Sequence, residues 1–136
     1  MKKLTLILLP ILLSLFVEGQ TLQDKQNVIQ KSIDFEALQM YYSNIEYEEK
    51  QQLFIVDNDL VPNNLELYKY GNKVTFMSKE DMFFRNIRNH IDFLNFTIET
   101  ETADIKFRYG MNGPTVILEF KKENDIWKII KSDLEK

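Results

Sequence analysis

Apolar and polar side chains alternate most regularly in the last third of the chain. Residues 103–109 place Ala, Ile, Phe and Tyr on one side, with charged residues between them. This period of two is typical of a β-strand with one buried face. Three similar apolar segments cover residues 91–100, 115–122 and 126–133. Asn112-Gly113 and Asn124-Asp125 supply turn residues between segments, so the pattern predicts a four-strand antiparallel meander.

A helical pattern is found near the N-terminus, over residues 21–33. Thr21 followed by Asp24 resembles a capping box. The apolar residues that follow form one stripe: Leu22, Val28, Ile29 and Ile33. The spacing predicts an amphipathic helix, and leaves open whether it continues through residues 35–42.

The middle of the chain predicts short strands. Residues 52–56 are rich in β-formers and are followed by Asp57-Asn58-Asp59, which indicates a strand and then a turn. Residues 65–70 and 73–77 alternate on either side of Gly71-Asn72. This pattern predicts a hairpin.

A second helix is expected after Ser78. The serine is a typical N-cap, and Glu80 and Asp81 would lie near the positive end of the helix dipole. We expect this helix to end at about Asn89.

Together these elements predict an α+β domain. The N-terminal helix is expected to pack on a curved antiparallel sheet that ends in the four-strand meander. The residues expected in or against the core are Ile105, Phe107, Leu118, Phe120 and Trp127.

Composition limits the chemistry that the chain can perform. Its 136 residues are 44% hydrophobic, enough for one compact domain. It has no cysteine and a single histidine, which excludes cysteine nucleophiles, disulfides, iron–sulfur clusters and multi-histidine metal sites. The net charge of -4 argues against a nucleic-acid partner. We expect no metal and no cofactor.

Residues 1–19 have the pattern of a secretory signal peptide. Lys2 and Lys3 precede a 14-residue apolar stretch at positions 4–17, and Gly19 stands at the expected cleavage position. The stretch is shorter than the ~20 residues that span a bilayer. We therefore expect a periplasmic or secreted protein, with residues 20–136 as a single domain and no transmembrane segment in the mature chain.

One segment near the C-terminus resembles a known group of domains. Residues 116–130 read Val-Ile-Leu-Glu-Phe-Lys-Lys-Glu-Asn-Asp-Ile-Trp-Lys-Ile-Ile. This segment is similar to the closing hairpin of nuclear-transport-factor-2-like and other cystatin-like α+β domains, which many small exported bacterial proteins of unknown function contain. The resemblance covers about residues 93–134. The group includes ketosteroid isomerases, polyketide cyclases and dehydratases, and non-enzymatic binding domains, but this chain lacks the long paired N-terminal helices of the catalytic members.

Two places suggest catalysis or metal binding. His90 could serve as a general base near an acid, although a histidine at the end of a helix is commonly structural. Asp57-Asn58-Asp59 offers oxygen ligands for calcium, but Val61 and Pro62 stand where an EF-hand needs a ligand and a glycine. We interpret that segment as a turn.

The three arginines lie close together in the sequence. Arg85 and Arg88 are three residues apart on the expected helix, and would form a fork for a carboxylate or phosphate. The alternative is that they pair with acids of the fold. Arg108 is the third.

Several aromatic residues could line a pocket or contact a partner, but in a small domain such residues usually belong to the core. They are Tyr41, Tyr42, Tyr68, Tyr70, Phe83 and Phe84.

No catalytic motif is visible, so the leading hypothesis is an exported, non-catalytic binding or accessory domain with a protein or envelope partner. The alternative is a small-molecule enzyme or ligand carrier with a cone-shaped pocket. There, Arg85 or Arg88 would hold an anionic apolar ligand, and His90 or a nearby acid would move a proton. The sequence leaves the oligomeric state open.

Overall fold

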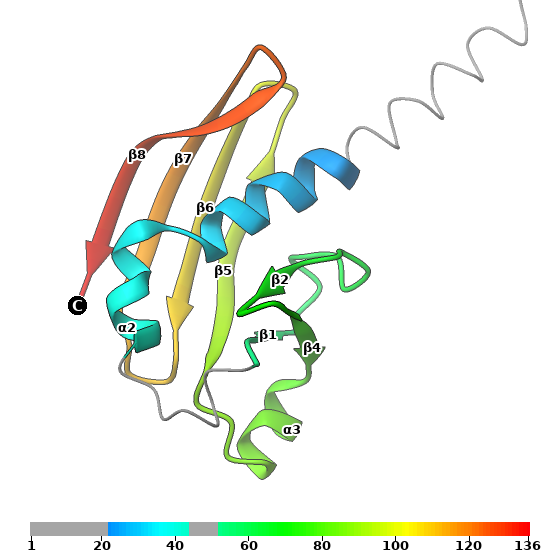
Figure 1. Cartoon of the computed structure of the whole chain (residues 1–136), viewed down its shortest axis with the longest axis vertical. Coiled ribbons are helices and arrows are strands. Elements are labelled where there is room, and N and C mark those ends of the chain that lie inside the picture. The colour runs from blue at the N-terminus through cyan, green and yellow to red at the C-terminus, as the bar shows by residue number, and fades with distance from the viewer. Residues whose placement is uncertain (1–21, 44–51) are drawn as a thin grey trace, which may run out of the picture.

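The computed structural model describes residues 22–43 and 52–136 and has an α+β fold. Its main sheet has six strands in the order β4-β1-β5-β6-β7-β8 (Figure 1). The strands are β1 (Phe54–Val56), β4 (Thr75–Met77), β5 (His90–Ile98), β6 (Thr102–Tyr109), β7 (Thr115–Glu123) and β8 (Ile126–Glu135).

The last four strands form the predicted antiparallel meander. Each pairs with the next along the chain, and the side chains of β6 alternate between buried and more exposed positions. The turn between β7 and β8 places Asn124 and Asp125 at φ 51° and 62°. In the turn before β7, Gly110 takes the positive φ, while a Cβ on Gly113 would lie 1.8 Å from the Tyr109 carbonyl oxygen.

The expectation of a purely antiparallel sheet is wrong at the other end of the sheet. β1 lies between β4 and β5 and pairs parallel with both. The expected hairpin is also shorter, because only β2 (Tyr68–Lys69) and β3 (Asn72–Lys73) pair. Tyr70 and Gly71 form its turn with positive φ, and the chain then leaves the hairpin to join β1. The sheet is therefore mixed.

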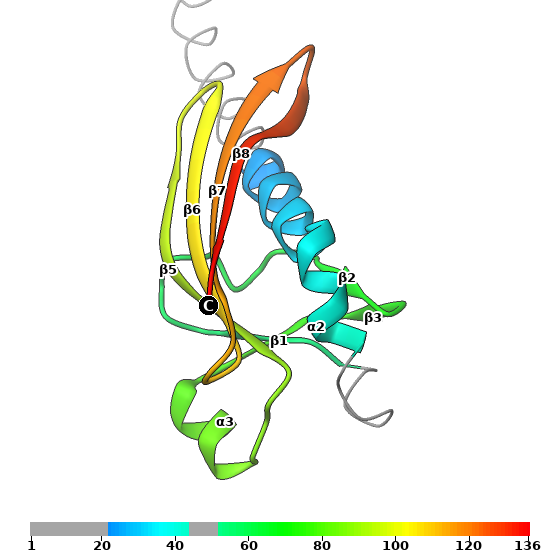
Figure 2. The same cartoon turned by 90° about the vertical axis from the view of Figure 1, so that its left-hand side faces the viewer.

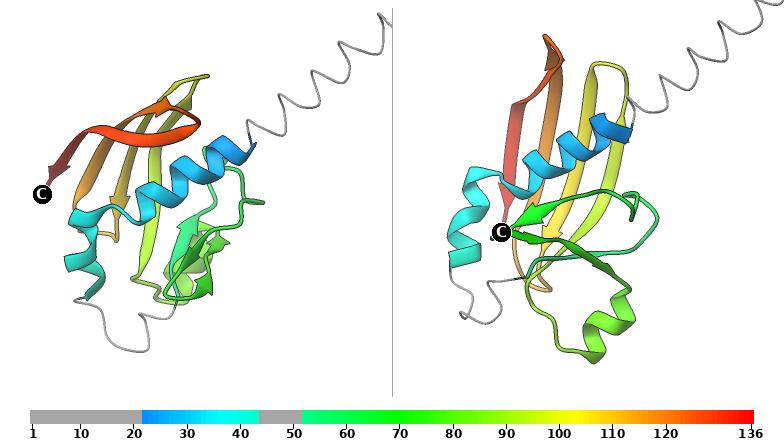
Figure 3. Two further views of the ribbon diagram at one scale, coloured as in Figure 1. Left: turned by 45° about the horizontal axis from the view of Figure 1, so that its top comes forward. Right: turned by 45° about the vertical axis from the view of Figure 1, so that its right-hand side comes forward.

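Residues 22–33 form the N-terminal helix, followed by η1 (Glu36–Leu38) and α2 (Gln39–Ser43). Figure 2 shows this helix on one side of the meander strands. Figure 3 shows the β2–β3 hairpin beside this helix. Gln30 joins the two, because its Nε2 donates to the Tyr68 carbonyl at 2.9 Å and its Oε1 accepts from the Tyr68 N–H at 3.0 Å.

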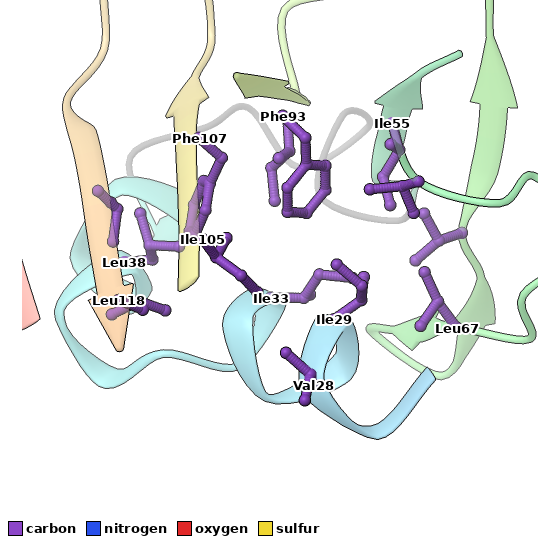
Figure 4. Packing of buried hydrophobic residues seen from close by; sticks show 14 of the residues in the cluster. Val28, Ile29, Ile33, Leu38, Ile55, Leu67, Phe93, Ile105, Phe107 and Leu118 are labelled. Atoms are coloured by element: carbon purple, nitrogen blue, oxygen red, sulfur yellow. The ribbon is translucent and has the colours of Figure 1, made fainter. Parts of the chain in front are cut away.

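The core lies between this helix and the sheet. The helix contributes Val28, Ile29 and Ile33, which belong to the same buried cluster as Phe93 and Phe107 of the sheet (Figure 4). All five residues that we expected in the core are buried there: Ile105, Phe107, Leu118, Phe120 and Trp127.

The second helix begins as expected but ends early. In α3 (Lys79–Phe84) the Ser78 hydroxyl accepts a hydrogen bond from the Asp81 N–H at 3.1 Å. The prediction of a helix to about Asn89 is wrong, because Asn86 takes φ 52° and a left-handed residue stops a helix. Residues 85–89 are therefore irregular.

The signal-peptide prediction and the capping role of Thr21 fall on residues outside the described ranges. Within residues 22–43 and 52–136, no helix has the length and apolar character needed to cross a bilayer.

Candidate functional site

His90, Asp92 and Arg108 lie on the same face of the sheet. His90 and Asp92 are two residues apart on β5, and Arg108 of β6 stands directly opposite Asp92. The neighbouring pair, Phe93 and Phe107, is buried in the core. Because side chains alternate along a strand, the three polar residues point away from that core.

This face is nevertheless covered where β5 begins. His90 and Asp92 are each only 8% exposed. Asn58, in the turn after β1, donates from Nδ2 to Asp92 Oδ1 at 3.1 Å and to the Phe93 carbonyl at 2.7 Å. Met82 of α3 is buried as well. α3 lies at this same end of the sheet (Figures 1 and 2). A turn and a helix thus enclose polar residues on a face that strand alternation would leave in solvent.

A cavity of about 210 Å³ lies among these elements, and a neighbouring hollow of about 440 Å³ shares four of its lining residues. The shared residues are Met82, Phe83, Ile87 and Met111. The cavity is also lined by Val56, Lys79, His90, Asp92 and Arg108. The hollow continues to Asn86, Arg88 and Asn112. We call the cavity and the hollow together the α3 groove.

The charges in the cavity are close to one another but loosely paired. Arg108 Nη2 and Lys79 Nζ each lie 3.9 Å from Asp92 Oδ2, which is too long for a hydrogen bond. The buried Nε of Arg108 and the buried Nδ1 of His90 have no hydrogen-bond partner in the described part of the chain. Buried polar atoms are rarely left unsatisfied, and the long distances to Asp92 leave the outer N–H groups of Arg108 and Lys79 without a close partner in this cavity.

Burial lowers the pKa of His90 below its ordinary value of 6.5, because desolvation disfavours the charged imidazolium. A backbone hydrogen bond with Ile87 and the Asp92 carboxylate act in the opposite direction but are smaller effects. His90 is therefore mainly neutral at pH 7.

Two of the apolar residues that line the groove are exposed: Phe83 is 78% exposed and Met111 is 69% exposed. Phe84 follows Phe83 on α3 and is 91% exposed, but it lies outside the lining of the cavity and the hollow. The interpretation of the aromatic residues as core is therefore wrong for Phe83 and Phe84, which extend from α3 without a covering element. It is also wrong for Tyr68 and Tyr70, which are exposed.

Tyr41 and Tyr42 agree with the core interpretation. Tyr42 is buried and donates to the Ile33 carbonyl at 3.0 Å. Its ring makes an edge contact with the exposed Tyr70, with the centroids 6.0 Å apart. Tyr41 packs against the core cluster.

Arg85 and Arg88 do not form the expected helical fork. Arg85 is the C-cap residue of α3, and Arg88 lies in the irregular segment, so the spacing of three no longer places them on one helix face. Both are exposed and line a separate hollow of about 240 Å³, and Arg88 also lines the α3 groove. Among residues 22–43 and 52–136, no acidic side chain pairs with either.

The segment 57–59 forms a turn, as we interpreted it. Asn58 Oδ1 accepts the Leu60 N–H at 3.1 Å, and Asp59 has φ 67°. In the described ranges, no three His, Asp or Glu side chains gather in a way that could hold a metal ion.

The sequence interpretation named His90, Arg108 and the turn with Asn58 separately, but it did not predict that they meet. It also did not predict that Lys79 and Asp92 line the same cavity as His90. One signal was available. The polar residues at 90 and 92 alternate with Ile91 and Phe93, which places them on one face. No sequence pattern indicated that α3 and the turn at Asn58 would cover that face.

Comparison with known proteins found no match: no family model, no curated protein and no solved structure matches this chain. The resemblance of residues 93–134 to cystatin-like domains therefore stays a prediction.

Proposed function

We propose that this protein is an exported, non-catalytic binding domain and that the α3 groove is the place where a partner protein binds. The observation that carries the proposal is the exposure of three apolar side chains, Phe83 and Met111 in the groove and Phe84 next to it on α3, beside a cavity with a polar wall. Aromatic residues and methionine are enriched at the centres of protein interfaces, where they are buried by the partner.

The alternative, an enzyme or carrier with a cone-shaped pocket, has less support. Such a pocket would need space between the N-terminal helix and the sheet, where Phe93, Phe107, Phe120 and Trp127 are at most 1% exposed. The cavity that His90 lines is on the other face, and it shares four lining residues with an adjoining hollow instead of forming a cone between the helix and the sheet. His90 also lacks a hydrogen-bonded acid at Nδ1 that would orient it as a general base.

Export and a cystatin-like fold belong to the same proposal. Export is supported by the residue pattern of positions 1–19. A cystatin-like fold is supported by the N-terminal helix sharing a core cluster with the meander, and by Trp127 of the closing hairpin being buried in it. N-terminal sequencing of the protein from the cell envelope tests export, and the expected first residue is Gln20.

Photocrosslinking in the native cell envelope tests the binding surface. A photoreactive phenylalanine analogue in place of Phe84 is expected to form a discrete adduct with another protein. The same analogue in place of Ile130, which is 59% exposed on β8, is the matched control and is expected to form none. Equal crosslinking at both positions, or none at Phe84, would contradict the proposal.

A further inference from the structure

We propose that the α3 groove recognises an extended acidic segment of its partner, and that an Asp or Glu side chain of that segment enters the cavity and pairs with Arg108 and Lys79. This inference rests on the proposed function and names the chemistry of the partner. It follows from the state of the polar groups in the cavity, the charge of the groove lining, and the exposed apolar residues in and beside the groove.

The polar wall of the cavity is incompletely satisfied. Arg108 Nε is buried without a hydrogen-bond partner among the described residues, and the nearest contact of the guanidinium with Asp92 is 3.9 Å. The Arg108 side chain as a whole is 38% exposed, so an incoming group would reach its Nη atoms and not the enclosed Nε. A carboxylate can bind a guanidinium through two parallel hydrogen bonds, which the two Nη groups can donate. The loosely paired guanidinium therefore favours an incoming carboxylate over an apolar side chain alone.

The charge of the site selects an anion. Lys79 and Arg108 oppose a single carboxylate, Asp92, and His90 is mainly neutral at pH 7. The cavity wall therefore has a net charge of about +1, since +2 − 1 = +1, and Arg88 adds a further cation along the adjoining hollow. The whole chain has a net charge of -4, so the lining of this groove is positive on an acidic protein, although the exposed Glu80 and Asp81 follow Lys79 on the outside of α3. One carboxylate would balance the charge of the cavity, and such complementarity guides partner choice.

The surroundings of the cavity indicate a protein segment as the source of the carboxylate. The cavity of about 210 Å³ has room for about seven waters at ~30 Å³ each, which is enough for an acidic side chain. Phe83, Phe84 and Met111 extend beyond it and would stay exposed if only a small free acid were bound. A chain with apolar residues next to the acid would cover them. The cavity and the hollow are continuous through four shared residues, as an extended segment requires.

Selection of peptides from a random display library tests this proposal without a known partner. The wild-type domain is the bait, and the Phe83→Ala, Phe84→Ala double variant removes peptides that bind elsewhere. We expect the selected peptides to contain Asp or Glu next to Phe, Leu or Met. Replacing that acid with its amide in the peptide is expected to weaken binding to the wild-type domain about tenfold or more. This arm does not depend on the folding of any protein variant.

Protein variants then assign the contact. Arg108→Gln is expected to weaken peptide binding as much as replacing the peptide's acid with its amide does. Combining the two changes should cause no further loss of affinity. Arg108→Lys keeps the charge but loses the planar fork, so its loss should be intermediate. Lys128→Gln is the charge-matched control, because Lys128 lies near the β7–β8 hairpin, at the other end of the sheet from α3, and should change binding less than about twofold (Figure 1).

Each other outcome overturns a definite part of the reasoning. Two outcomes would overturn the acidic-segment inference and leave the proposed function standing. In the first, the selected peptides need Phe83 and Phe84 but contain no acid. In the second, they bind the Arg108→Gln variant as well as the wild-type domain. Absence of any peptide that needs Phe83 and Phe84 would overturn both. Hexanoate is the probe for a free acid: if it displaces no peptide at millimolar concentration, the protein source is supported. If it binds as tightly as the selected peptides, the protein source is wrong.

Discussion

Replacing Phe107 with alanine tests whether the buried face of the meander is assigned correctly. Phe107 is 0% exposed and lies in the centre of the sheet, opposite Phe93 on one side and Val116 on the other. Its ring centroid is 5.4 Å from that of Phe93. The substitution therefore removes a large apolar side chain from a site where the neighbouring strands limit relaxation.

Two terms give the size of the effect. Full burial of a phenylalanine side chain contributes about 1.5–3 kcal/mol relative to exposure. A residual void of about 50–100 Å³ costs a further ~1–2.5 kcal/mol at about 24 cal/mol per Å³. We expect Phe107→Ala to lower the free energy of unfolding by about 3–5 kcal/mol.

Urea denaturation followed by Trp127 fluorescence and far-ultraviolet circular dichroism measures this loss. Phe84→Ala is the matched control, because the same atoms are removed from a side chain that is 91% exposed. Its effect should stay within about 0.5 kcal/mol, with an unchanged m value. A loss below about 1 kcal/mol for Phe107→Ala, or equal losses for the two variants, would refute the assignment of the buried face.

Three further predictions each concern one residue. Because burial lowers the pKa of His90, the unfolded chain takes up the proton first, so wild-type stability should fall as pH drops below about 6.5. In the His90→Asn variant, the free energy of unfolding, measured by urea denaturation at each pH, should fall less steeply across that pH range. Asp24 Oδ1 accepts from Trp127 Nε1 at 3.0 Å and from Lys122 Nζ at 3.1 Å, so Asp24→Ala should cost about 1–3 kcal/mol in urea denaturation; Asp24→Asn keeps an acceptor but loses the ion pair, and should cost less. Gly113→Ala should lower the melting temperature through a loss of about 1–3 kcal/mol, because its Cβ would clash with the Tyr109 carbonyl; an unchanged melting temperature would contradict the turn geometry.

The α3 groove shows why the site was harder to predict than the core. The strand predicted over residues 91–100 is confirmed, and β5 begins one residue earlier, at His90. Alternation along β5 puts His90 and Asp92 on the face away from the core, yet each is only 8% exposed. The hydrogen bond from Asn58 to Asp92 joins residues 34 positions apart, and no local pattern encodes such a contact.

The sequence by itself determined the four-strand meander, its turns, the buried face with Phe107 and Trp127, and the cap at Ser78. These features depend on residues within a few positions of one another, where alternation, helical spacing and turn preference act directly. Only the tertiary structure decided that β1 pairs parallel with β4 and β5, that α3 ends before Asn86, and that Phe83 and Phe84 stay uncovered. Those features depend on which distant segments meet, because burial, strand pairing and the protonation of a residue such as His90 are set by neighbours in space.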